Sequence, residues 1–176
     1  MKNIIVFAGS NSKTSINKQL AVYASTLLES VSVTVLDLND FPLPVFSVDI
    51  EREEGIPSLA QSFFNHIKNT DGIVLSLAEH NGAYATVFKN LFDWMSRIDG
   101  KVWQNKPMLL MATSPGARGG QSVLDIAKGR FPFNGGHIVA TFSLPKFNDH
   151  FKSGAISDDA LDALLKEAVD TLKNEL

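Results

Sequence analysis

The chain has 176 residues, of which 44% are apolar, and this is enough to bury one substantial hydrophobic core but hardly two. Its 16 basic and 19 acidic residues nearly balance and form no long block of one sign, so the charge pattern indicates no nucleic-acid partner. The sequence contains no cysteine, which excludes disulfides, thiolate nucleophiles and cysteine-bound metal clusters. We therefore expect a single domain over residues 1–176, in which any redox chemistry comes from a bound organic cofactor.

The first apolar run, at residues 4–8, leads into Ser, Asn and Thr residues without a cleavage-like site, so we interpret it as a buried strand rather than a signal peptide. No apolar stretch approaches the roughly 20 residues of a membrane-spanning helix. We expect a cytoplasmic protein with no membrane partner.

Short apolar runs alternate along the chain with longer segments of helical period, which is typical of βαβ units. The runs are rich in Val, Ile and Leu, as expected of strands covered on both faces, and predict five strands at residues 4–8, 31–36, 73–78, 108–113 and 138–142. The expected helices are residues 15–30, 57–69, 83–98, 120–128 and 158–174. Right-handed crossovers then give a doubly wound α/β sheet, whose ligands lie beyond the carboxyl ends of the strands.

The last expected helix has the clearest pattern. Ser157 precedes it in the position of an N-cap, and Asp158 and Asp159 suit the positive end of its dipole. Its apolar residues predict one core-facing stripe, made of Leu161, Leu164, Leu165, Ala168, Val169 and Leu172. This stripe indicates packing rather than function.

The helix from Tyr84 to Ile98 carries an apolar arc wider than one core-facing stripe needs, comprising Val87, Phe88, Leu91, Phe92, Trp94, Met95 and Ile98. Either the helix is buried within one chain, or the excess covers a second subunit. Asp93 is spaced for a weak i, i+4 ion pair with Lys89 or Arg97.

A loop dense in hydroxyl and amide side chains, residues 9–17, follows the first strand and includes Lys13. Free N–H groups at a helix start favour an anion, and hydroxyl groups can donate to its oxygens. An ordinary polar turn with a Ser or Thr cap has the same composition. The loop matches neither the G-x-G-x-x-G pattern nor the P-loop pattern, so a monophosphate is a better match than a diphosphate.

Two further loops follow the third and fourth strands. In residues 78–84, Asn81 and Gly82 form a common turn pair and suit a simple connection, while His80 and Tyr84 offer aromatic planes for a flat ring. Residues 113–121 contain three glycines, which let the backbone face a ligand, although an ordinary surface turn has the same composition.

With these motifs the sequence resembles the NAD(P)H-dependent FMN reductase family, a flavodoxin-like group that includes bacterial chromate, quinone and azo-dye reductases. The resemblance covers residues 1–142. The first loop is similar to the family's Gly-Ser, Arg, Ser-x-Asn pattern: Gly9, Ser10, Ser15 and Asn17 match, and Ser12 stands where the Arg is usual. Neighbouring Lys13 is then the only positive charge of the loop.

The other two motifs resemble the family in the same order. The second is similar to Pro-Glu-Tyr-Asn-Gly, with Ala78 and His80 as departures, and Lys89-Asn90 and Asp93-Trp94 follow it. The third is similar to Ser/Ala-x-x-Gly-x-x-Gly-Gly and begins at Ser114.

The resemblance implies a flavodoxin-like doubly wound sheet of five parallel strands, in the order 2-1-3-4-5 and flanked by helices, that binds FMN. The first loop would wrap the FMN phosphate, and the other two would lie on either side of the isoalloxazine ring. The cofactor-binding residues that it implies are Gly9, Ser10, Asn11, Ser12, Lys13, Ser15, Ile16, Asn17, Ala78, Glu79, His80, Asn81, Gly82, Ser114, Pro115, Gly116, Gly119 and Gly120.

The same resemblance implies an oxidoreductase that passes hydride from NADPH or NADH through FMN to a small-molecule electron acceptor, such as a quinone, azo compound, flavin or metal ion. Because the flavin carries the chemistry, we expect no catalytic side chain and no metal site. The resemblance also implies a homo-oligomer, dimer or tetramer, built around the helix from Tyr84 to Ile98. Two other classes stay open: a non-enzymatic flavin-binding electron carrier, and a flavin-responsive sensor module, which Ser12 in place of Arg favours.

The longest irregular stretches, residues 39–55 and 146–156, are expected to shape the acceptor pocket. Phe41, Phe46 and Phe147 either line that pocket or anchor these stretches, and we favour anchoring.

Overall fold

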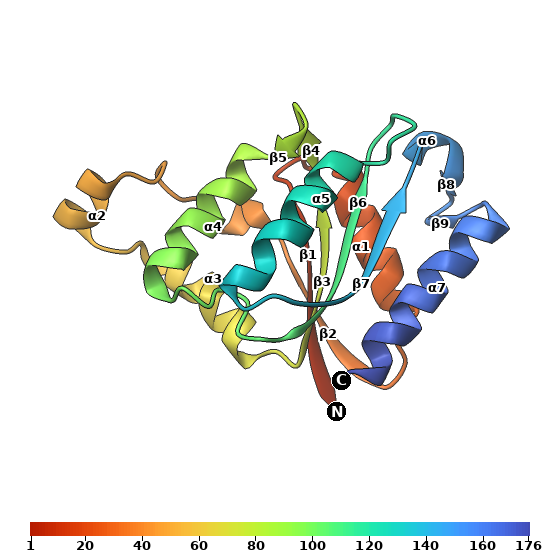
Figure 1. The fold of residues 1–176 in the computed structure, drawn as a ribbon, viewed down its shortest axis with the longest axis horizontal. Coiled ribbons are helices and arrows are strands. Elements are labelled where there is room, and N and C mark those ends of the chain that lie inside the picture. The colour runs from red at the N-terminus through yellow and green to blue at the C-terminus, as the bar shows by residue number, and fades with distance from the viewer.

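The computed structural model describes residues 1–176 and has a central sheet of five parallel strands in the order β2-β1-β3-β6-β7 (Figure 1). These strands are β1 (Lys2–Gly9), β2 (Val31–Leu36), β3 (Gly72–Leu77), β6 (Pro107–Thr113) and β7 (His137–Leu144). Counted in chain order within this sheet, they have the expected order 2-1-3-4-5. The flavodoxin-like α/β prediction is confirmed.

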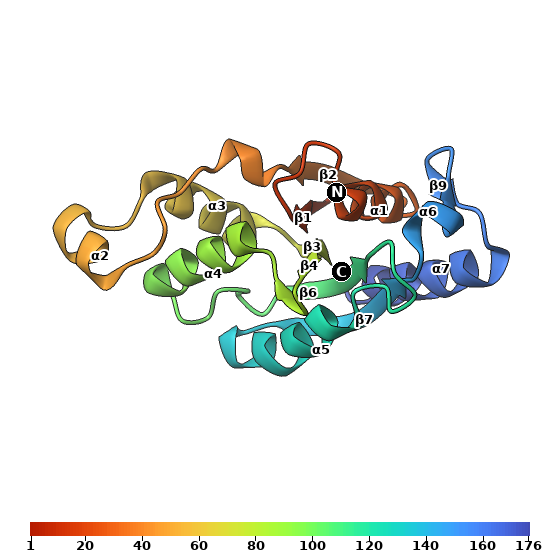
Figure 2. The same cartoon turned by 90° about the horizontal axis from the view of Figure 1, so that it is seen from above.

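Helices cover both faces of the sheet (Figure 2). One face carries α3 (Ser58–Asn69), α4 (Thr86–Ile98) and α5 (Gln121–Arg130), and the other carries α1 (Ile16–Thr26) and α7 (Asp159–Asn174). Because strand side chains alternate between faces, β1 sends Ile5 and Phe7 into the first core and Ile4 and Val6 into the second. The sheet therefore divides the buried apolar interior into two clusters, one on each face, with 23 and 18 buried residues.

The strands are in parallel register, so their carboxyl ends meet at one edge of the sheet. Ile5 pairs with Ile73 on β3, and Val74 pairs with Leu109 on β6. The loops that follow β1, β3 and β6 therefore begin at the same edge, although their sequence positions lie far apart.

Helix boundaries differ from the expected ones where the backbone turns. The first helix ends at Thr26 rather than Ser30, and Ser30 has a left-handed φ of 61° that a helix does not continue through. The expected helix start at Ala83 is wrong, because residues 79–84 form a hairpin and α4 begins at Thr86. Gly120, with φ 79°, caps α5, which continues to Arg130.

The structure also has eight short elements that were not expected, seven in segments expected to be loops and one, β5, at the expected start of the third helix. They are the 3-10 helices η1 (Leu38–Asp40) and η2 (Phe131–Asn134), the helices α2 (Val48–Glu54) and α6 (Phe147–His150), and the strands β4 (Glu79–His80), β5 (Ala83–Tyr84), β8 (Phe151–Lys152) and β9 (Ala155–Ile156). Strands β4 and β5 pair antiparallel, as do β8 and β9.

Three packing expectations are wrong in detail. Strand β2 lies at the edge of the sheet and is not covered on both faces, since Val33 and Val35 are 38% and 45% exposed. Asp158, not Ser157, caps α7, because its carboxylate accepts a hydrogen bond from Leu161 N. Leu164 is 55% exposed, so the buried stripe of α7 is narrower than expected.

The wide apolar arc of α4 is largely covered within the chain. Trp94 is fully buried and donates from its indole nitrogen to Pro44 O at 2.8 Å, and the ring of Phe46 packs edge-on against it at 5.0 Å. Asn90 holds the same segment by accepting from Phe46 N and donating to Pro44 O. The segment before α2 therefore closes over α4.

The helix α2 itself stands away from the rest of the molecule (Figure 1). Arg97 reaches it and pairs with Glu51 at 2.9 Å, whereas the expected Lys89–Asp93 pair forms within α4 at 2.7 Å. No helix is long and apolar enough to cross a membrane.

Candidate functional site

A cavity of about 320 Å³ opens at the carboxyl edge of the sheet, where all three predicted loops meet. Its size lies in the range of small-molecule and cofactor sites. Its lining comes from the β1–α1 loop, the β3–β4 junction and the β6–α5 loop: Ser10, Ser12, Thr14, Ser15, Ile16, Asn17, Ala78, Glu79, His80, Thr113, Ser114 and Pro115.

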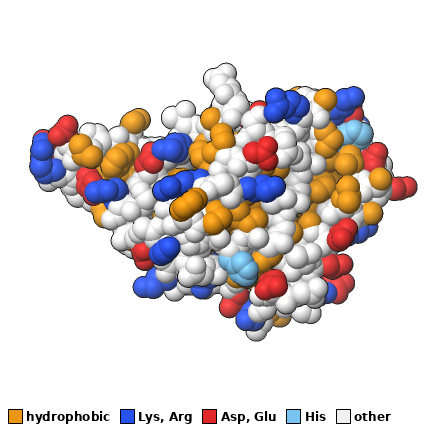
Figure 3. Space-filling model, viewed as in Figure 1, with side chains coloured by type: hydrophobic (Ala, Val, Ile, Leu, Met, Phe, Trp, Pro, Cys, Tyr) orange, Lys and Arg blue, Asp and Glu red, His pale blue; other side chains and the backbone are white.

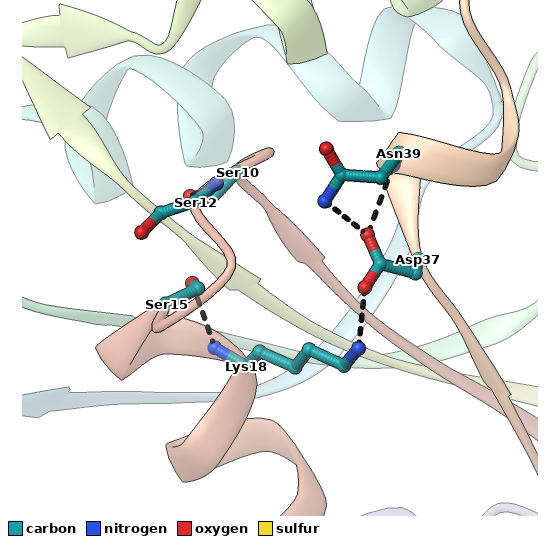
Figure 4. A network of polar contacts seen from close by, with 6 residues as sticks. All are labelled: Ser10, Ser12, Ser15, Lys18, Asp37 and Asn39. Carbon is teal, nitrogen blue, oxygen red and sulfur yellow. Dashed lines mark hydrogen bonds and ion pairs between the residues drawn. The ribbon is translucent and has the colours of Figure 1, made fainter.

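The β1–α1 loop offers an uncommitted set of hydrogen-bond donors. The N–H groups of Lys13, Thr14, Ile16 and Asn17 have no partner in the protein. The loop hydroxyls donate to no protein group, while Ser10 and Ser15 accept from the backbone N–H groups of Ser12 and Lys18 (Figure 4). Hydroxyl and amide donors at a helix start, with no carboxylate between residues 9 and 17, suit the phosphate of FMN.

Lys18, in the first turn of α1, does not add a free charge to this loop. Its ammonium contacts Asp37 at 2.5 Å, and Asp37 also accepts from the backbone and side chain of Asn39 (Figure 4). Partial burial opposes ionisation of Asp37, but the bonds from Lys18 and Asn39 outweigh it and lower the pKa of the carboxyl. Lys13 is the loop's remaining cation.

A buried polar network at the base of the cavity joins the three loops. Asn17 is 3% exposed, and its amide oxygen accepts from Ser76 Oγ at 2.7 Å and from Thr113 N at 3.0 Å. Its amide nitrogen donates to Thr113 O, and Thr113 Oγ1 donates to Leu144 O. The Asn17 side chain therefore fixes α1 to β3 and β6, which leaves only its backbone N–H for a phosphate.

The second motif folds as a two-residue hairpin. Asn81 and Gly82 have φ of 52° and 77°, as a type I′ turn requires, so the turn interpretation of this pair is correct. The side-chain carboxylate of Glu79, in the hairpin, accepts a hydrogen bond from Val123 N in the first turn of α5. The hairpin is therefore tied to the helix that follows the third loop.

The two aromatic residues of this motif lie in different surroundings. His80 is exposed and lines the cavity. Tyr84 instead packs its ring parallel to Phe131 at 6.2 Å, and its hydroxyl is buried without a partner. Burial raises the pKa of Tyr84 to about 12. Because Tyr84 does not line the cavity, of the two only His80 offers a ring plane to it.

The third loop is packed at its base and exposed at its tip. A Cβ at Gly119 would lie 2.4 Å from Ser143 Oγ and a Cβ at Gly120 would lie 2.8 Å from Ala112 Cβ, so both positions require glycine. Ser143 Oγ donates to Gly119 O at 3.0 Å. Residues 115–118 are exposed, and a Cβ at Gly116 would meet nothing closer than 3.7 Å.

The structure brings ten of the predicted residues into the cavity lining. Eight others are not part of this lining: Gly9, Asn11, Lys13, Asn81, Gly82, Gly116, Gly119 and Gly120. The prediction omitted Thr14 and Thr113. Thr14 belongs to the hydroxyl-rich loop, so the composition of that loop could have identified it. Thr113 ends an apolar strand, and no sequence pattern marked it as a site residue.

The two long irregular stretches line neighbouring hollows. A cavity of about 240 Å³ lies between Asn11, residues 38–43 and α4, and a groove of about 460 Å³ lies between α1 and the β8–β9 hairpin. Phe41 packs edge-on against Phe63 at 5.0 Å, and Phe147 stacks on Phe151 at 4.7 Å. Both residues anchor their segments, although Phe41 also lines the smaller cavity. The structure assembles no group of three or more metal-ligating side chains.

Comparison with known proteins identifies a matching family and relatives that are named as reductases. Residues 2–149 match the model of a family described as NADPH-dependent FMN reductase. A quinone reductase of Escherichia coli is 28% identical over 121 residues, and a 2-hydroxy-1,4-benzoquinone reductase of Burkholderia is 36% identical over 118 residues. Each alignment covers 66% of this chain and 62% of the relative, so the chain spans less than two thirds of the length of these relatives.

A solved structure supports the fold over the whole chain. The flavoenzyme NAD(P)H:(acceptor) oxidoreductase FerB of Paracoccus denitrificans superposes with a TM-score of 0.75 at 24% identity. The superposition covers 99% of both chains.

Proposed function

The chain belongs to the NADPH-dependent FMN reductase family, and from this membership we propose that it is an FMN-dependent NAD(P)H oxidoreductase that reduces a small-molecule acceptor. The observation that carries the proposal is the cavity at the carboxyl edge, whose donors have no partner within the protein. Two relatives are named as reductases of quinones, which supports a quinone as the acceptor class.

The residues of the chain divide into those that hold the phosphate and those that face the ring. Ser10, Ser12 and Thr14 supply hydroxyl donors for the phosphate. The N–H groups of Ile16 and Asn17, at the helix start, supply backbone donors for it. Without the usual Arg at position 12, the loop binds the phosphate mainly through neutral donors and the helix dipole.

The ring lies, in this proposal, between residues 78–82 and the β6–α5 loop. The exposed hairpin and the glycine-rich loop flank the open side of the cavity, and Glu79 and Ser143 hold these two segments in place. When bound, FMN supplies the two-electron chemistry between reduced nicotinamide and acceptor. The protein binds, orients and leaves one face open, so no side chain acts as a covalent or acid–base catalyst.

The test is the visible spectrum of the protein after incubation with FMN and desalting, followed by NADPH under anaerobic conditions and then a quinone. We expect retained yellow colour, bleaching by NADPH and recovery of the colour with the quinone. Retained colour without bleaching favours the electron carrier or sensor. Loss of all flavin on desalting contradicts the cofactor assignment.

We propose further that the chain forms a homodimer through α4 and the adjoining α2. The closed arc of α4 leaves little apolar surface of its own, but Val45 and Val48 beside it are 74% and 64% exposed. Light scattering after size exclusion tests this: we expect a dimer at micromolar protein and dissociation in a Val45→Asp, Val48→Asp variant. A monomeric wild-type protein contradicts it.

A cytoplasmic location, tested by fractionation, stays a prediction.

A further inference from the structure

Two basic side chains at the carboxyl edge lack an acidic partner. Arg118 lies at the exposed tip of the β6–α5 loop, and Lys146 lies just before α6, where it is also exposed. Neither forms an ion pair, and the guanidinium of Arg118 bonds only the hydroxyl of Ser122, at 3.0 Å. The charge of both residues is therefore available to a ligand.

Backbone hydrogen bonds hold these two segments together. Lys146 N donates to Gly116 O at 2.9 Å, and Phe147 N donates to Ser114 O at 3.0 Å. Gly119 N donates to the same Gly116 oxygen at 3.3 Å and closes the turn that carries Arg118. Both ribbon views place the β6–α5 loop beside α6 (Figures 1 and 2).

The backbone of Lys146 adopts a conformation that non-glycine residues rarely take. Its φ is 47°, in the left-handed region. This conformation lets consecutive N–H groups, those of Lys146 and Phe147, bond to carbonyls of the third loop. The position of Lys146 is therefore fixed by the loop that borders the cavity.

This edge is basic although the chain has a net charge of −3. Figure 3 shows Lys and Arg side chains over the β6–α5 loop and α6 along the upper edge. The acid nearest to Lys146 in sequence is Asp149, which is exposed and forms no ion pair, and the acid nearest to Arg118 is Asp125, which accepts a hydrogen bond from the Gln121 side chain. Asp158 faces His150 at 3.9 Å. The local excess of positive charge suits an anion that reaches the rim from the cavity.

We propose that Arg118 and Lys146 bind the 2′-phosphate of NADPH and make the chain prefer NADPH to NADH, an inference that rests on the proposed oxidoreductase function. With the nicotinamide over the ring site, the adenosine end of the donor extends past the rim of the cavity. An Arg fork and a Lys ammonium suit a phosphate, and NADH carries a neutral hydroxyl at the same position.

The experiment compares FMN-loaded wild-type protein with Arg118→Gln, Lys146→Gln and the double variant, with NADPH and NADH as donors. Lys128→Gln is the matched control, because Lys128 is exposed and unpaired but lies near the C-terminal end of α5. Calorimetric titration with 2′,5′-ADP and with 5′-ADP, at low and high salt, gives a readout that needs no turnover.

We expect each removed cation to raise the KM for NADPH about tenfold, the size of one lost charge-assisted hydrogen bond, and to leave the KM for NADH unchanged. The dissociation constant of 2′,5′-ADP should rise in parallel and depend on salt, while the Lys128→Gln control behaves as wild type. Equal losses for both donors, or unchanged 2′,5′-ADP binding, would overturn the assignment.

The two proposals fail in different ways. A protein that retains FMN and oxidises both donors with equal KM values contradicts only the proposal that Arg118 and Lys146 bind the 2′-phosphate. A protein that retains no flavin or oxidises neither donor contradicts the proposed function, and 2′,5′-ADP binding then still tests Arg118 and Lys146.

Discussion

Asn17 shows how the side chain of a motif residue can serve a site without touching its ligand. The resemblance placed it among the cofactor-binding residues, yet its amide is committed to Ser76 and Thr113. Only the N–H of its backbone remains free for a phosphate. The sequence contained the residue and its position but not the partners, because these lie 59 and 96 residues away along the chain.

Replacing Asn17 with Ala should therefore weaken the fold as well as the site. The change leaves Ser76 Oγ and Thr113 N buried without a partner, which costs about 2–4 kcal/mol of unfolding free energy. Urea denaturation measures this, and FMN titration should show weaker binding because the three loops lose their common anchor. For the denaturation measurement Asn11→Ala is the control, since Asn11 is exposed and its side chain makes no hydrogen bond. Equal stability of the two variants would contradict the anchoring role.

Asp37 should make stability depend on pH on the acid side. Its folded-state pKa is lowered, despite partial burial, by bonds from Lys18 and Asn39. Its contribution is therefore complete above the unfolded-state value of about 3.9 and is lost as the pH falls through the lower folded value. Asp37→Asn should destabilise the protein near pH 7 and flatten the acid limb of stability against pH. Asp40→Asn, at an exposed and unpaired position, should keep the wild-type slope; an unchanged slope in Asp37→Asn would refute the assignment.

Among the elements, the β4–β5 hairpin depends on a single backbone conformation. Gly82→Ala places a Cβ in open space but at φ 77°, so strain alone should cost about 1 kcal/mol and loosen the hairpin. We expect weaker FMN binding in a flavin fluorescence titration, with a smaller change in global stability. Gly100→Ala is the matched control, because its Cβ also meets nothing within 4 Å and its φ is not positive. Unchanged flavin affinity in Gly82→Ala would show that the hairpin does not border the ring.

The sequence predicted elements best where local pattern and tertiary burial agree. All five strands and five helices exist near their expected positions, because parallel strands are recognisable as apolar runs and amphipathic helices repeat every 3.6 residues. The missed elements are short, and their residues are held by distant partners. The α2 arm is an example: Asn90 and Trp94 of α4 secure the chain that leads into it.

The expected N-cap and the expected buried stripe of α7 were wrong for a related reason. Ser157 and Asp158 are both good N-cap residues, so sequence could not decide between them, and the hydrogen bond to Leu161 N selects Asp158. Leu164 fits the helical period but lies beside β7, the last strand of the sheet, where no further layer covers it. A periodic pattern predicts which face is apolar but not how far the neighbouring layer extends.

In the whole molecule, parallel register converts three separate motifs into one cavity. The three loops follow strands β1, β3 and β6, which are neighbours in the sheet although they span more than a hundred residues. Sequence reasoning could predict this convergence from topology alone. It could not predict that Tyr84 turns into the core, because that depends on Phe131, whose aromatic contact comes from the other end of α5.

Because the walls of the cavity come from three segments, a ligand that contacts all of them should stabilise the whole fold. We expect FMN to raise the melting temperature more than riboflavin at equal concentration, since riboflavin lacks the phosphate that the β1–α1 loop would hold and so binds more weakly. Differential scanning fluorimetry, with ring fluorescence corrected, measures both shifts. A Ser10→Ala, Ser12→Ala, Thr14→Ala variant removes three hydroxyl donors and should reduce the advantage of FMN while leaving the riboflavin shift in place. Equal shifts in the wild-type protein would mean that this loop does not bind the phosphate, whatever the fate of the ring site.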